Sequence, residues 1–218
     1  MTAEARLAIV RAAEQLFASE GVERPSLREI ARTAGQGNTN AAQYHFGDRD
    51  GLLLAVLDRH RDRVEGRRDE LLDMVESAVP ADPRSLSAAL VSPLVAELSE
   101  PDGGAAHLQI VAEVMARPVR FADVLDAHWQ APSIRRWSQL VEPLLPPEAV
   151  GRPLHRRFAV VRFVHAELAS RARERGGRGD HRLFASHLVD LVTAMLAAPV
   201  TPWTTELIRP PHHRGRPR

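Results

Sequence analysis

The chain contains no cysteine, and this absence removes several kinds of chemistry at once. Disulfides, thiolate catalysis, cysteine-ligated zinc and thiol redox sensing are all excluded. The chain also lacks lysine, so that all 29 basic residues are arginine, and with 28 acidic residues the net charge is only +1. No global electrostatic field therefore indicates a nucleic acid or a membrane as partner.

No apolar run in the sequence is long enough to span a bilayer, and the N-terminus lacks the apolar core of a signal peptide. With 218 residues, 44% hydrophobic and 26% charged, the composition is typical of a soluble globular protein of one or two domains. We therefore expect a cytoplasmic protein with no membrane partner.

Motifs of enzymes and metal sites are also missing. None of the ten histidines has an acidic residue three positions before it, as a di-iron helical bundle requires. There is no His-Glu-x-x-His, no phosphate-binding glycine loop and no Gly-x-Ser-x-Gly. We expect no catalytic residues, no metal and no cofactor.

Three short helices are predicted in the first fifty residues. The first covers residues 3–20 and ends at Gly21; its apolar stripe is Ile9, Ala13, Leu16 and Phe17, and the residues expected to face away are Arg11, Glu14 and Gln15. The second follows a capping box, Ser26 with Glu29, and ends at Gly35 as a left-handed cap; its stripe is Leu27, Ile30, Ala31 and Ala34.

The third helix is predicted to begin after Asn38 as N-cap and to run to about His45. At 100° per residue, Thr39, Ala42 and Phe46 fall on one side, and Asn40, Gln43 and Tyr44 on the other. One face should therefore pack against the protein while the other is free. A tight glycine turn between two short helices is typical of a helix-turn-helix.

Three segments carry a specific resemblance: R-x-x-I-V-x-A-A-x-x-L-F-x-x-x-G from Arg6 to Gly21, then S-L-R-E-I-A-x-x-A-G, then Y-H-F-G-D-R-D-G-L. Over residues 5–57 the sequence resembles the N-terminal domain of the tetracycline-repressor (TetR) family. The resemblance implies an all-α fold, with a helix-turn-helix DNA-binding domain at 1–47 and a helical effector-binding and dimerisation domain at 48–198. The turn after Gly35 departs from the family pattern, because Asn38 replaces the usual serine cap and the turn is one residue longer.

The resemblance also implies DNA-binding residues. Asn40 and Gln43 are the residue types that bond an adenine edge in two places. The further candidates are Ser26, Arg28, Asn38, Thr39, Tyr44, His45 and Arg49, chiefly for phosphates at helix starts. The alternatives are that Ser26 only caps its helix and His45 only packs. Residues 1–50 hold six arginines against seven acidic residues, so attraction to DNA must come from local placement.

A long helix is predicted from Asp48 to about Ser77, with the apolar stripe Leu53, Leu57, His60, Val64, Leu71 and Val75. Further helices are predicted at about 84–99, 104–116, 119–130, 133–142, 152–175 and 180–198. The resemblance implies that the last two pack against their twins in a homodimer. Their stripes are Leu154, Phe158, Val161, His165 and Leu168, and Phe184, Leu188, Leu191 and Met195.

Large side chains in the body are candidates for an effector pocket: Met115, Phe121, Leu125, Trp129, Trp137, Phe163 and His165. Ordinary core packing is the alternative for each. Residues 199–218 are rich in proline and arginine without periodicity and are expected to be disordered. Their end, Arg214 to Pro217, resembles the core of an AT-hook; the alternative is a plain basic tail.

These features predict a TetR-type transcription factor, most simply a repressor. It would bind a pseudo-palindromic double-stranded DNA operator as a dimer and be released by a small apolar effector. The alternative is a ligand-independent regulator, or an activator, whose helical body only dimerises.

Overall fold

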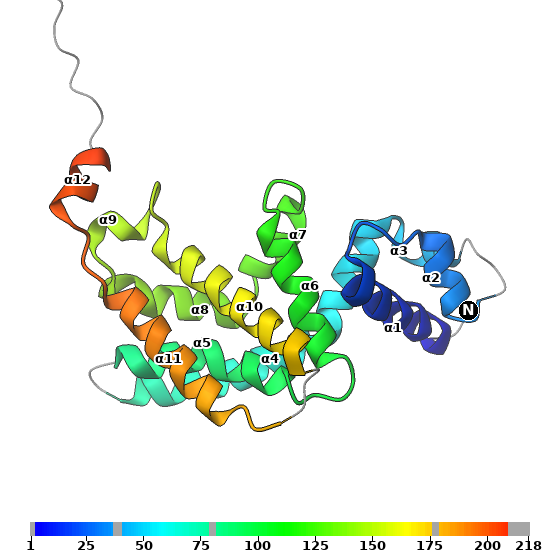
Figure 1. Cartoon of the computed structure of the whole chain (residues 1–218), viewed down its shortest axis with the longest axis horizontal. Coiled ribbons are helices and arrows are strands. Elements are labelled where there is room, and N and C mark those ends of the chain that lie inside the picture. Colours follow the sequence, from blue (N-terminus) through cyan, green and yellow to red (C-terminus); the bar gives the residue numbers. More distant parts are fainter. Residues whose placement is uncertain (1–2, 37–40, 79–81, 176–178, 209–218) are drawn as a thin grey trace, which may run out of the picture.

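The computed structural model describes residues 3–36, 41–78, 82–175 and 179–208. Within these ranges every regular element is a helix, which confirms the predicted all-α fold. Figure 1 shows two parts, a small head formed by the first helices and a larger body formed by the helices that follow.

The head consists of α1 (Ala3–Glu20), α2 (Leu27–Thr33) and α3 (Ala41–Phe46). Ser26 caps α2, because its hydroxyl accepts a hydrogen bond from the amide of Glu29 at 3.1 Å. Gly35, with φ of 69°, ends the helix in the left-handed region as the sequence predicts. The longer turn and the cap at Asn38 lie outside the described residues.

Helix α4 (Arg49–Ser77) joins the head to the body (Figure 1). Its cap is Asp48, whose carboxylate accepts a hydrogen bond from the amide of Gly51 at 2.8 Å. At 1.5 Å per residue, 29 residues span about 44 Å, so one rigid element reaches both parts.

The body helices are α5 (Pro83–Glu97), α6 (Gly104–Ala116), α7 (Ala122–Trp129), α8 (Pro132–Val141), the 3-10 turn η1 (Glu142–Leu144), α9 (Pro147–Val150), α10 (Arg156–Arg175), α11 (Arg182–Ala197) and α12 (Pro202–Ile208). Two predicted starts are too early. Helix α7 begins at Ala122 and α10 at Arg156, where Pro153 disfavours helical backbone in the residue before it.

Helix α12 contradicts the prediction of disorder from residue 199 onward for part of that stretch. The amide of Thr204 donates to the hydroxyl of Thr201 at 3.3 Å, which caps the new helix, and Pro202 takes its first position. The AT-hook-like end, Arg214 to Pro217, lies outside the described residues.

Two hydrophobic clusters form the interior. The larger one joins α4, α5, α6, α8, α10 and α11 in the body. The other fills the head and continues into the body through Ile110, Val114, Phe121 and Val124 of the α6–α7 region. The head is therefore joined to the body not only through α4 but also by direct packing against α6.

No single described helix is long and apolar enough to cross a membrane; α11 and α12, which meet at 63°, reach that length and composition only as a bent pair.

Candidate functional site

The exposed side of α2 and α3 carries the side chains predicted to touch DNA. Tyr44 is 85% exposed, and Arg28 and Gln43 are exposed as well. Ala42 and Ile30 on the opposite side are fully buried. The predicted division into a packing face and a free face is thus present for the described part of these helices; Asn38, Thr39 and Asn40 lie outside it.

Two of the predicted phosphate contacts are oriented inward. Arg49 donates from Nη1 to the backbone carbonyl of Glu23, and reaches that of Val22 at 3.5 Å, so its guanidinium holds the loop after α1. The ring of His45 packs edge-on against Tyr44 and Phe46, at 5.1 and 6.2 Å between ring centroids. The geometry therefore gives both residues a structural role within the head.

Body arginines neutralise acidic residues of the head. Arg120 makes a two-pronged ion pair with Asp50, at 2.9 and 3.0 Å, and also contacts Glu23 at 3.1 Å. Arg117 pairs with the same Glu23 at 2.5 Å. The unfavourable charge of the isolated head sequence is thus partly cancelled by the body.

Arg24, before α2, and Arg28 and Arg32, on α2, are exposed. Arg28 and Arg32 are four residues apart and so share one face of that helix. The sequence reasoning selected only Arg28. The i, i+4 spacing was a signal that could have added Arg32.

A buried ionic network, here called the junction cluster (Glu14, Arg59, His60, Arg63 and Glu97), links α1, α4 and α5 where head meets body. His60 lies between two carboxylates, with Nε2 2.5 Å from Glu14 and Nδ1 3.1 Å from Glu97. Arg59 donates to Glu14 at 2.5 Å and Arg63 to Glu97 at 2.6 Å. The expectation that Glu14 faces solvent is wrong. Its side chain is 3% exposed, because Arg59 and His60 of α4 pack against it and bond its carboxylate.

Electrostatics in the junction cluster favour the charged forms. Burial lowers the pKa of His60, but the hydrogen bonds and charges of Glu14 and Glu97 outweigh burial and leave that pKa raised. Burial likewise raises the pKa of Glu97, but the bonds from Arg63 and His60 prevail and bring it to about 2. Both carboxylates thus favour the protonated form of His60, and Arg59 and Arg63 also lie near its ring nitrogens, at 3.2 and 2.8 Å.

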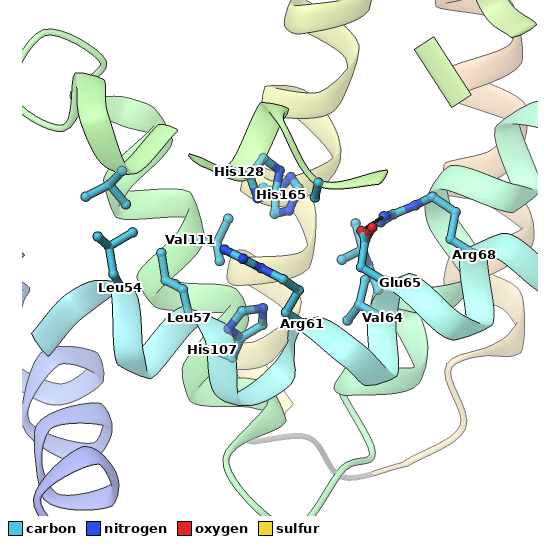
Figure 2. A pocket seen from close by; sticks show the side chains of 13 residues that line it. Leu54, Leu57, Arg61, Val64, Glu65, Arg68, His107, Val111, His128 and His165 are labelled. Atoms are coloured by element: carbon cyan, nitrogen blue, oxygen red, sulfur yellow. Dashed lines mark hydrogen bonds and ion pairs between the residues drawn. The ribbon is translucent and has the colours of Figure 1, made fainter. Parts of the chain in front are cut away.

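A cavity of about 50 Å³ opens in the body beside this cluster. Its polar lining consists of Arg61, Glu65, Arg68, His107, His128 and His165, and its apolar lining of Leu54, Leu57, Val64, Leu94, Val111, Val124 and Ala131. Figure 2 shows α4 crossing the view with Arg61, Glu65 and Arg68 on it, and His128 and His165 above it.

Of the seven residues predicted to hold an effector, His165 alone lines this cavity. Trp137 is fully buried and donates from Nε1 to the carbonyl of Leu86, while Met115 belongs to the body core and Phe121 to the head core. Trp129 packs on Phe158 at 4.4 Å; Leu125 and Phe163 are partly buried against the core. These six residues therefore pack in or against the core instead of lining the cavity. The cavity lining is also more polar than the sequence predicts.

The three cavity histidines are neutral at pH 7. Burial lowers the pKa of His128 to about 3, helped by the positive charge of Arg68. Burial also lowers that of His165 to about 4, and the pKa of His107 lies well below its ordinary value because of burial and the neighbouring charge of His60. Rings of His60 and His107 stack at 4.5 Å, so the junction cluster and the cavity touch.

Comparisons with known proteins agree with this architecture. Residues 9–56 match the sequence model of the bacterial regulatory proteins of the tetR family. No curated protein sequence is detectably similar to the chain.

Three solved structures share the fold over nearly the whole chain. AmtR of Mycobacterium smegmatis has a TM-score of 0.56 and 22% identity, covering 92% of this chain and 89% of its own. The fatty acid degradation regulator FadR of Bacillus halodurans has a TM-score of 0.55 and 15% identity, and the match covers 92% of this chain and 98% of that one. A Rhodococcus protein assigned to the TetR-family transcriptional regulators has a TM-score of 0.57 and 20% identity, and the match covers 89% of this chain and 100% of that one. Residues 9–56 thus match the N-terminal domain of the tetR family of bacterial regulatory proteins, and the chain as a whole shares the all-helical fold of these three structures.

Proposed function

We propose that this protein is a ligand-responsive, cytoplasmic transcriptional regulator that binds a pseudo-palindromic operator as a homodimer and acts as a repressor. The observation that carries the proposal is a single packed assembly in which a helix-turn-helix head and a buried polar cavity meet through the junction cluster. A body that served only for dimerisation would need no such cavity.

The exposed face of α2 and α3 supports DNA reading. Gln43 on α3, and Asn40 by its residue type, could bond adenine in the major groove, and exposed Arg28 and Ser26 at the start of α2 would contact phosphates. Exposed Arg24 and Arg32 add positive charge at the same surface. Sequence preference would then come from amide side chains and affinity from arginines.

A second copy of the chain would cover the outer face of α11. The predicted stripe on α10 is used inside the chain: Val161 and Leu168 are fully buried and His165 nearly so. On α11, however, Leu183 is 84% exposed and Leu191 36%, with exposed Ala194 on the same side. A dimer formed in this way would have to hold its two heads about 34–36 Å apart to reach successive major grooves.

Ligand binding would reach the head through His107. Its ring stacks on His60, and His60 bonds Glu14 of α1. A ligand that moves His107 or α4 shifts the junction cluster and therefore the angle of the head. The shift in DNA affinity is limited by the difference in ligand affinity between the two head positions.

Selection of bound DNA from a random pool tests the DNA function directly. We expect a palindromic consensus and a stoichiometry of two chains per site. Asn40→Ala with Gln43→Ala should relax the consensus, whereas Arg28→Ala should weaken all sequences alike and reduce the log–log salt slope by about 0.9. Recovery of no enriched sequence would contradict the proposal.

A further inference from the structure

The cavity lining has more hydrogen-bonding capacity than the protein uses. Nε of Arg68, Nδ1 of His107 and Nε2 of His128 are buried, and none of them has a hydrogen-bond partner among the residues that the structure describes. All three residues line the same cavity. A buried polar nitrogen without a partner costs about 1–3 kcal/mol, so three at one place indicate a site built for something else to bond.

The charges around the cavity indicate the sign of that partner. Arg68 is paired with Glu65 at 3.0 Å, and both bond Ser133 of α8, so this pair is neutral as a unit. Arg61 reaches the cavity from the same helix, and its counter-ion Asp58 is 53% exposed and not part of the lining. With neutral histidines the lining therefore carries one net positive charge.

Size and the remaining lining narrow the choice. The volume of about 50 Å³ is on the order of a few water molecules, which suits a compact head group. Leu54, Leu57, Val111 and Val124 offer an apolar wall for a short tail. No group of three or more histidines and carboxylates among the described residues is arranged to hold a metal ion.

We propose that this cavity binds a small organic carboxylate, with the anionic oxygens bonded by Arg61, His107 and His128 and the short apolar tail against α4 and α6. The inference rests on the proposed function, since it names the chemical class of its effector. It replaces the apolar effector expected from the sequence. Doubly charged phosphate would exceed the single positive charge of the lining.

Binding of the anion would draw a proton into the cavity, because a carboxylate beside a neutral imidazole stabilises its charged form. The titratable groups that face the three histidines are Arg61, Glu65 and Arg68 on α4, together with His60 and Glu97 behind His107. The pKa values of the three cavity histidines lie below their ordinary value in the absence of the anion, so proton uptake on binding would report on these histidines.

Isothermal titration calorimetry of the full chain with matched acids and amides tests the proposal: acetate with acetamide, butyrate with butyramide, benzoate with benzamide. At least one acid should bind about tenfold or more tightly than its amide, as charge-assisted hydrogen bonds predict. Titration in two buffers of different ionisation enthalpy should show proton uptake. Inorganic phosphate should bind more weakly than that acid.

Three variants separate the cavity from other sites. Arg61→Gln and His128→Leu should each weaken the acid by about tenfold or more. Arg135→Gln, at an exposed position of α8, is the control and should leave binding unchanged. The proposal is overturned if no acid exceeds its amide, if Arg61→Gln binds as wild type does, or if phosphate binds best. A selected DNA consensus without acid binding would leave the proposed function standing and remove only this inference.

Discussion

Four imidazoles stand close together where the head meets the body, and they behave as two groups. His60 is held by two carboxylates, which raise its pKa, whereas His107, stacked on it at 4.5 Å, has a pKa lowered by burial and an Nδ1 without a partner among the described residues. His128 and His165 resemble His107 in having lowered pKa values. Both ring nitrogens of His60 in the junction cluster thus have hydrogen-bond partners, whereas several buried nitrogens of the cavity have none among the described residues.

The difference shows how similar burial can serve two ends. A buried polar network with every member satisfied fixes one arrangement of helices. Buried polar groups without hydrogen-bond partners destabilise the free protein, and a ligand that supplies the partners gains binding free energy from them. In the proposed function, the contact between these two groups would couple ligand binding to DNA binding.

Removing a carboxylate from the junction cluster should have the largest effect. Glu97→Ala removes one of the two carboxylates that hold His60 and the nearest carboxylate of Arg63, and breaking a buried pair in this way costs about 3–5 kcal/mol. Urea unfolding at pH 7 measures the loss. Glu70→Ala, exposed on α4, is the control and should stay within about 0.5 kcal/mol. Equal losses in both variants would show that the cluster contributes nothing specific.

Acid should weaken the protein through the cavity before it affects the junction cluster. The pKa of His165 is about 4 in the folded state against 6.5 unfolded, so the unfolded state binds the extra proton and stability falls as pH drops from 6.5 toward 4. Glu97, with a pKa of about 2 against 4.5, loses its contribution only between those values. His60, whose pKa is raised, contributes fully below 6.5 and loses its contribution only as pH rises through the folded value.

Replacing His165 tests this order. His165→Leu should reduce the slope of the unfolding free energy between pH 6 and 5 by about 1.4 kcal/mol per pH unit. Leu94→Ala, in the same cavity wall, lowers stability but should leave the slope unchanged. An unaltered slope in His165→Leu would contradict the assignment of a neutral histidine there.

Exposed ion pairs between head and body should matter least for stability. Arg120 and Asp50 are both about two-fifths exposed, so solvent screens their attraction. Arg120→Ala should cost at most about 1 kcal/mol in urea unfolding and less at high salt. A loss comparable to that of Glu97→Ala would mean that the surface pairs, and not the junction cluster, hold the head.

Local patterns in the sequence predict the helices well and the cavity poorly. Caps such as Ser26 and Asp48, and the placement of His60 in the apolar stripe of α4, depend on neighbours within a few residues. Glu14 reads as a surface residue because its partner His60 lies 46 positions away.

The cavity is likewise assembled from helices that are distant in sequence, since α4, α6, α7 and α10 each contribute one or a few polar side chains. Aromatic size drew the sequence prediction to Trp137, which the structure uses as core with its Nε1 satisfied by Leu86. No periodicity marks which buried histidine is left without a partner.

The most direct test of the contrast is the pair of unfolding free energies of His60→Leu and His107→Leu at pH 7, measured against wild type. His60→Leu should cost about 3 kcal/mol, because Glu14 and Glu97 lose a buried cation. His107→Leu should lie within about 1 kcal/mol of wild type or be more stable, because it removes an unsatisfied nitrogen. Equal losses in the two variants would contradict the division into a structural junction and a ligand-binding cavity.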